Sequence, residues 1–213
     1  GSAVPSGRSR DVAVRASPDL LARVARLVGA RVLSSTPVAG GYTPATRLVC
    51  ETEAGRLFVK AGSTPLTAEF LRREIEVYGR ISGPFVPRMI ACEDHETEPV
   101  LVIEDLSACA WPPPWTPRRV ELALRAIESM HRSGGNLPPY SRVHGSRPEG
   151  WREVARDPRP FLALGLAGEE WLRAGLPALV DHEARCPTDG PALTHWDIRS
   201  DNMCFDGDRV VLV

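Results

Sequence analysis

A histidine, an aspartate and an asparagine stand close together near the end of the sequence. The stretch THWDIRSDN places His195, Asp197 and Asn202 in the pattern H-x-D-x-x-x-x-N, just before the run MCF. A carboxylate there can orient and deprotonate a hydroxyl, and the later amide can offer its carbonyl oxygen to Mg²⁺. The spacing indicates phosphoryl transfer and arises by chance in roughly one chain in a hundred. The alternative is a polar turn in which Asp197 and Asp201 cap backbone groups.

Lys60 is the second candidate, because it is the only lysine among 26 lysine and arginine residues. The helix expected after it carries Phe70, Glu74, Val77/Tyr78 and Ile81 on one face. A carboxylate on an apolar face is costly unless an opposite charge meets it, so we expect Glu74 to pair with Lys60. An ammonium can contact a carboxylate and a phosphate oxygen together, where a guanidinium fork would fit differently. The alternative is an exposed strand lysine placed there by chance.

Two helices, two strands of a hairpin and one further strand are expected to position Lys60 and Glu74. Their patterns predict helices at 17–32 and 64–83, a hairpin of strands at 48–53 and 56–61, and a strand within 98–106. Ser17 is the expected cap of the first helix.

The second half of the chain reads as mainly helical. WPPPW at 111–115 predicts a stiff linker, since proline interrupts regular structure. A helix follows Thr116, residues 150–185 look helical, and a hairpin turns at Asp206-Gly207. The expected division is a flexible leader, a mostly β half, a linker and a mostly α half, at 1–16, 17–106, 107–115 and 116–213.

Composition excludes several classes of protein. The 213 residues are 43% hydrophobic and 25% charged with a net charge of −1, which argues against a nucleic-acid partner. No apolar run approaches the length of a membrane span, so no membrane partner is expected. Five scattered cysteines without a C-x-x-C pair favour free thiols and a cytoplasmic location over disulfides or a metal framework.

Four stretches in order, FVK, LRREIEVYGRI, VLVIEDLS and HWDIRSDN, resemble the aminoglycoside phosphotransferase and choline kinase-like branch of the protein-kinase fold. The resemblance covers residues 35–213. It implies an α+β, bilobal, protein-kinase-like fold, with a small β-rich N-terminal lobe over ATP or GTP. An α-rich C-terminal lobe would carry the catalytic loop. The implied activity is phosphorylation of a small-molecule hydroxyl acceptor.

The resemblance also implies roles for individual residues. The nucleotide positions lie in a small-residue loop, the strand, the following helix and the hinge: Gly40, Gly41, Thr43, Lys60, Glu74, Glu104 and Leu106. Lys60 would hold the α- and β-phosphates, with Glu74 as its partner. The carbonyl of Glu104 and the amide of Leu106 would contact adenine. Trp111 and Trp115 would pack against this hinge, or alternatively wall a substrate pocket.

The catalytic positions implied by the resemblance lie in the loop at 195–202. Asp197 matches the catalytic base and Asn202 a Mg²⁺ ligand, while His195 would brace the loop. Arg199 could steady charge on the transferring phosphoryl group, with a surface arginine as the alternative.

One departure from the family concerns the second metal ligand. An aspartate is expected directly after the last strand, and the sequence ends there at Val213. The expectation is that this is a fragment or an incomplete chain with weak Mg²⁺ binding and little turnover. The alternatives are a catalytically inactive nucleotide-binding or scaffold protein of the same fold, or a protein kinase. An antibiotic, a choline-like amine, a sugar and an amino alcohol all stay open as acceptors.

Overall fold

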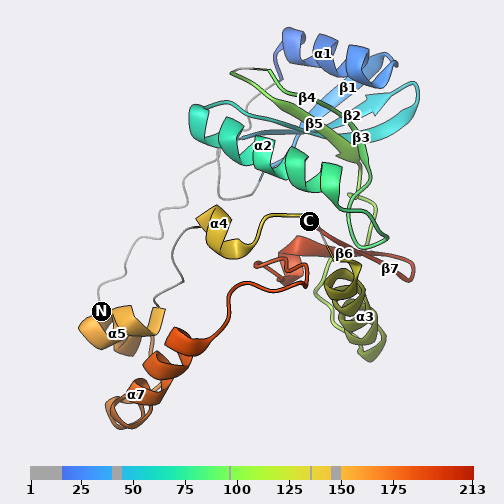
Figure 1. Cartoon of the computed structure of the whole chain (residues 1–213). Coiled ribbons are helices and arrows are strands. Elements are labelled where there is room, and N and C mark those ends of the chain that lie inside the picture. Colours follow the sequence, from blue (N-terminus) through green and yellow to red (C-terminus); the bar gives the residue numbers. More distant parts are fainter. Residues whose placement is uncertain (1–15, 40–44, 96, 135, 145–149) are drawn as a thin grey trace, which may run out of the picture. The chain divides into compact units, whose positions relative to one another are not determined.

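The computed structural model describes residues 16–39, 45–95, 97–134, 136–144 and 150–213. The chain folds as two compact units (Figure 1). The first unit comprises Gly1–Asn136 together with Ala192–Val213, and the second comprises Leu137–Pro191. The division into these two units reflects which residues pack together. The lobe boundary expected at 107–115 is a different division and stays a prediction.

A five-stranded antiparallel sheet is the centre of the first unit. Its strands lie in the order β1-β2-β3-β5-β4. Their bounds are β1 (Val32–Pro37), β2 (Thr46–Thr52), β3 (Gly55–Ala61), β4 (Met89–Glu93) and β5 (Val100–Glu104). The predicted hairpin of β2 and β3 and the predicted strand β5 are confirmed. The short strand β4 was not expected from the sequence.

Alternation along β2 and β3 gives the sheet two different faces. Leu48, Cys50, Leu57 and Val59 point to one face and are buried in a core under helix α1 (Pro18–Val28). Successive side chains on a strand point to opposite faces. The residues between them therefore point to the other face, which helix α2 (Pro65–Arg80) partly covers (Figure 1).

Helix α1 begins as expected and ends early. The Ser17 side chain accepts a hydrogen bond from the Leu20 amide at 3.1 Å, which is the predicted cap. Gly29 adopts a left-handed φ of 64° after the last helical residue, Val28. The expected helix to residue 32 is therefore wrong at its end, because a left-handed glycine stops the helix and β1 starts at Val32.

Helix α2 is confirmed, but its buried face differs from the expected one. Leu71, Ile75 and Tyr78 pack against the sheet, while Phe70 is 44% exposed. Tyr78 belongs to the expected face and does pack against the sheet, but the expectation for Phe70 is wrong because the sheet covers the side of the helix that carries Leu71 and Ile75. Glu74 lies at the edge of the buried stripe, with 29% of its side chain exposed.

A hairpin and a long helix complete the first unit. Strands β6 (Met203–Asp206) and β7 (Arg209–Leu212) turn at Gly207, whose φ is 59°. They pack against α3 (Pro117–Ser133) through a core that includes Met130, Phe205 and Leu212. The short 3-10 turn Ser200–Asn202 leads directly into β6, so the hairpin fixes the end of the 195–202 loop.

The second unit is helical, as its sequence predicts. It contains α4 (Tyr140–His144), α5 (Gly150–Arg156), α6 (Arg159–Ala163) and α7 (Glu169–Arg185). The Glu183 carboxylate accepts hydrogen bonds from the amides of Trp151 and Arg152 and so holds the start of α5 against α7. Among the described residues, no helix is both long and apolar enough to span a bilayer.

Candidate active site

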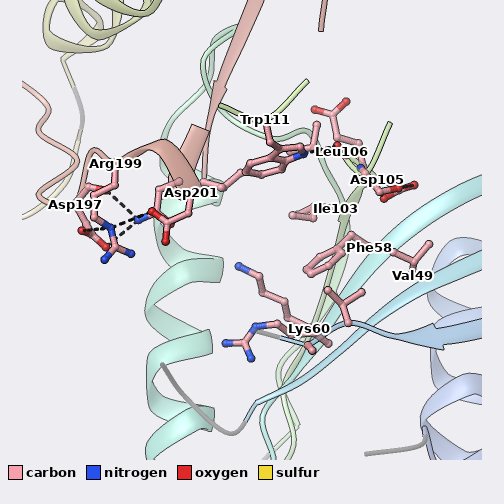
Figure 2. Close-up of a pocket in the computed structure, with 17 residues that line it drawn as sticks. Val49, Phe58, Lys60, Ile103, Asp105, Leu106, Trp111, Asp197, Arg199 and Asp201 are labelled. Carbon is pink, nitrogen blue, oxygen red and sulfur yellow. Dashed lines mark hydrogen bonds and ion pairs between the residues drawn. The ribbon is translucent and has the colours of Figure 1, made fainter. Parts of the chain in front are cut away.

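A pocket of about 830 Å³ lies within the first unit (Figure 2). One wall comes from the open face of β2, β3 and β5, including Val49, Phe58 and Lys60. The other wall comes from the loop before β6, including Asp197 and Asn202. Two segments that lie more than a hundred residues apart in the sequence thus meet at one cavity.

The predicted contact between Lys60 and Glu74 is confirmed. The Lys60 Nζ donates to Glu74 Oε1 at 2.6 Å, and 22% and 29% of the two side chains are exposed. Glu74 also contacts Tyr78, and burial together with this negative charge raises the pKa of the Tyr78 hydroxyl. Lys60 therefore keeps a fixed partner while its ammonium faces the pocket (Figure 2).

Asp197 and Asn202 are joined directly. The Asn202 Nδ2 donates to the Asp197 carbonyl at 2.9 Å and to Asp197 Oδ2 at 2.8 Å. Because the amide nitrogen makes both bonds, the amide oxygen is the atom that Asn202 can offer to a cation. Arg199 forms ion pairs with Asp197 at 3.1 Å and with Asp201 at 3.3 Å, so it links the two carboxylates (Figure 2).

His195 lies half-buried at the start of this loop. Burial lowers the pKa of its imidazole, against the Asp197 charge and a backbone hydrogen bond to Val213, which raise it. A second backbone bond, from Val213 to the Asn202 carbonyl at 3.0 Å, joins the same two segments. Between His195 and Asp197, Trp196 has a φ of 67°, a conformation that is uncommon for bulky residues and clusters in functional loops.

The far end of the pocket is apolar. Val49, Phe58, Ile103 and Leu106 line it together with Trp111. The Trp111 Nε1 donates to the Leu106 carbonyl at 3.2 Å, so the indole packs on the expected hinge and also walls the pocket. Such a slot suits a flat aromatic ring, with the edge of the chain at 104–106 beside it. The Glu104 carbonyl and Leu106 amide stay predicted contacts of that ring.

The Glu104 side chain has a structural task. Its carboxylate accepts from Arg209 at 2.6 and 3.1 Å and from the Arg88 amide at 2.8 Å. Arg209 also donates to the carbonyls of Pro84 and Val86. Hydrogen bonding to Arg209 lowers the pKa of Glu104, against the opposing effect of burial. This pair ties the β6-β7 hairpin to the end of β5.

We expect Glu104→Gln to lower the free energy of unfolding by about 1–3 kcal/mol at neutral pH, because a charge-assisted pair is lost. A carboxyl group whose pKa is lower in the folded state stabilises the fold above its unfolded pKa, and this contribution is lost on acidification through the folded pKa. The difference in unfolding free energy between wild type and Glu104→Gln should therefore stay constant above about pH 5 and shrink below it. Urea unfolding across that range measures it.

Glu53→Gln is the matched control, since Glu53 pairs with the exposed Arg31. It should cost less than about 1 kcal/mol. A Glu104→Gln penalty that stays constant down to pH 3 would contradict the electrostatic account.

Sequence reasoning missed some pocket residues, and others lie outside the described part of the chain. Gly40, Gly41 and Thr43, the expected phosphate loop, lie outside the described residues. Arg47 lines the pocket without having been singled out, and Asp201, which the sequence suggested only as a backbone cap, lines it too. The hairpin register could have found Arg47, since it lies opposite Lys60. In the described ranges, no group of three or more His, Cys, Asp and Glu side chains could hold a metal ion.

The chain is similar to a family model and to solved structures of other proteins. The family model described as "Phosphotransferase enzyme family" matches residues 34–212. Spectinomycin phosphotransferase APH(9)-Ia, solved with ADP and spectinomycin, is 15% identical with a TM-score of 0.56, over 92% of this chain and 67% of that one. A thermostable mutant of aminoglycoside phosphotransferase APH(4)-Ia, solved with AMP-PNP and hygromycin B, is 12% identical with a TM-score of 0.53, over 92% and 70%.

These structural likenesses confirm the predicted α+β, kinase-like fold, with its antiparallel five-stranded sheet followed by helices. At such low identity they bear on the fold alone. No curated protein sequence matches the chain.

Proposed function

The chain belongs to the phosphotransferase enzyme family, and from that membership we propose that it transfers the terminal phosphoryl group of ATP or GTP to a hydroxyl group of a small molecule. One observation carries the proposal. Lys60, which is paired with Glu74, lines the same pocket as Asp197 and Asn202, although more than a hundred residues separate these positions in the sequence. A nucleotide clamp beside a candidate base is the arrangement that phosphoryl transfer requires.

The pocket has a separate place for each part of a nucleotide. The apolar slot around Phe58, Ile103 and Trp111 takes the base. Lys60 binds the phosphates, and Glu74 holds its ammonium in one position. ADP and AMP-PNP are the nucleotides bound in the structures of the two similar proteins. A nucleotide bound in this way would direct its phosphate chain toward Asp197.

Asp197 acts on the acceptor in this proposal. Its carboxylate orients the attacking hydroxyl and takes the hydroxyl proton as the new ester bond to the γ-phosphorus forms, while the bond between the γ-phosphorus and the β-phosphate breaks and the nucleoside diphosphate leaves. The Asn202 amide donates to Asp197 Oδ2 at 2.8 Å and Arg199 pairs with Asp197 Oδ1 at 3.1 Å, so the carboxylate is held in one orientation for the incoming hydroxyl. Arg199, paired with Asp197, is placed to steady negative charge nearby.

The residues present fit Mg²⁺ carried in with the nucleotide. Mg²⁺ prefers hard oxygen ligands, keeps several waters, and is commonly held by few protein groups plus substrate phosphates. Because the Asn202 side-chain nitrogen makes both hydrogen bonds to Asp197, its amide oxygen is available as a hard oxygen ligand. Asp201 lines the same pocket and offers a carboxylate. When bound, Mg²⁺ neutralises charge on the phosphates.

The acceptor is proposed as a small molecule that carries a hydroxyl group. Spectinomycin and hygromycin B occupy the two similar structures, which makes aminoglycoside-like compounds the first set to screen. Choline-like amines, sugars and amino alcohols form the second set.

The proposal is tested by incubating the protein with Mg²⁺-ATP or Mg²⁺-GTP and each compound of such a library. Acceptor-dependent release of nucleoside diphosphate, together with a new phosphate-ester signal in ³¹P NMR, is the expected result. Calorimetric titrations with ADP and with GDP run in parallel. A protein that binds neither ADP nor GDP would contradict the proposal. Nucleotide binding without transfer to any compound would favour the inactive nucleotide-binding alternative.

A further inference from the structure

Arg47 lies directly opposite Lys60 on the neighbouring strand. The antiparallel register of β2 and β3 pairs Arg47 with Lys60, Val49 with Phe58, and Glu51 with Arg56. Residues directly opposite each other point to the same face of a sheet. Arg47 and Lys60 both line the pocket, so the open face of this hairpin carries two adjacent cations.

The three cross-strand pairs on this face differ in charge. Glu51 and Arg56 carry opposite charges and form an ion pair at 3.3 Å. Val49 and Phe58 are apolar and line the base slot. The third pair has two positive charges, and like charges directly opposite each other destabilise a sheet. An anion bound between these two side chains would contact both cations.

We propose that Arg47 binds the phosphate chain of the nucleotide jointly with Lys60, and that it favours triphosphates over diphosphates and nucleosides. The inference rests on the proposed nucleotide site. Arg47 lines the pocket wall beside Lys60, whose ammonium is paired with Glu74 at 2.6 Å, and so places a guanidinium next to that ammonium. A guanidinium can bind a phosphate with two parallel hydrogen bonds, which an ammonium cannot do.

The order of the pairs along the hairpin supports this assignment. The apolar pair Val49–Phe58 and the cationic pair Arg47–Lys60 are two residues apart on each strand, a separation of about 7 Å. A base stacked on the first pair therefore extends its phosphates over the second. One Arg47 nitrogen donates to the Ala45 carbonyl at 3.3 Å, which holds the guanidinium at the end of β2 nearest the preceding loop.

The test measures the affinity of adenosine, ADP and AMP-PNP, with Mg²⁺ present, for wild type, Arg47→Gln and Arg47→Lys. We expect Arg47→Gln to weaken AMP-PNP binding about tenfold or more, ADP binding by a smaller factor, and adenosine binding by less than about twofold. Arg47→Lys should recover part of the AMP-PNP affinity, because it keeps the positive charge but cannot form the two parallel hydrogen bonds of a guanidinium group. Arg31→Gln makes the same charge change at an exposed residue that pairs with Glu53 and should leave all three affinities unchanged.

The outcomes separate this inference from the proposed function. Wild type that binds none of the three ligands and none of their guanine counterparts contradicts the proposed nucleotide site, and Arg47 then loses its role with it. Wild type that binds all three, with Arg47→Gln unchanged, overturns only the inference. An equal loss for adenosine and AMP-PNP would also overturn it, since it would show a structural role. Thermal unfolding of each variant verifies folding, and Arg47→Lys, the milder substitution, supplies the same comparison if Arg47→Gln does not fold.

Discussion

Asp197→Asn is expected to lower kcat about a thousandfold, within the range that a general base contributes. The affinity for AMP-PNP should stay within about threefold, because asparagine can still accept the hydrogen bond that Asn202 donates to Asp197 at 2.8 Å. What is lost is the ability to take the hydroxyl proton. A loss confined to kcat is the signature of an interaction made in the transition state. Steady-state kinetics with the acceptor found by screening, together with nucleotide titration, measures both quantities.

Asp208→Asn is the matched control for this variant. Asp208 is an aspartate of the β6-β7 turn whose side chain is 75% exposed and pairs with Arg118 outside the pocket. The kcat of Asp208→Asn should match that of wild type. If Asp197→Asn kept more than about a tenth of the wild-type kcat, Asp197 would not be the base.

The second large effect is expected at Lys60. Lys60→Met should weaken AMP-PNP binding about 10- to 100-fold, since a charge-assisted hydrogen bond is worth about 1.5–3 kcal/mol. Glu74→Gln should weaken it by a smaller factor, because Lys60 remains but loses the partner that fixes it at 2.6 Å. Lys60→Arg should not restore wild-type affinity, since a broad guanidinium group cannot replace a compact ammonium group between the Glu74 carboxylate and a phosphate.

Glu76→Gln is the control on the same helix. Glu76 pairs with Arg80 at 2.6 Å on the exposed side of α2, with about half of each side chain in solvent. The Glu76→Gln variant makes the same charge change as Glu74→Gln and should leave AMP-PNP affinity unchanged. Equal affinities of Glu74→Gln and Glu76→Gln would mean that the pair with Lys60 has no part in binding.

Much of the site could be predicted because its parts carry strong local patterns. The hairpin, the helix and the H-x-D-x-x-x-x-N loop each follow from turn residues and periodicity. The unusual lysine and a carboxylate on an apolar stripe then predicted a contact over 14 residues, which the structure confirms. Family resemblance linked these pieces to one pocket, a long-range relation that periodicity cannot supply.

Other features depended on packing that the sequence does not encode locally. Phe70 and Leu71 both begin apolar stripes on α2, and only the position of the sheet decides that Leu71 is buried at 4% exposure. The strand β4 has few residues and pairs only with β5, so its pattern alone was too short to recognise. Arg47 became notable only once the register placed it opposite Lys60.

The most direct test of the account uses the single lysine of the chain. An acyl-phosphate derivative of ATP places a reactive carbonyl at the end of its phosphate chain, and a nearby amine attacks that carbonyl and displaces the nucleotide. Peptide mapping by mass spectrometry locates the acyl group. The account predicts acylation of Lys60 that excess AMP-PNP prevents and that Lys60→Arg abolishes. An unlabelled Lys60, or labelling that excess nucleotide does not reduce, would contradict the claim that this ammonium faces the phosphates of a bound nucleotide.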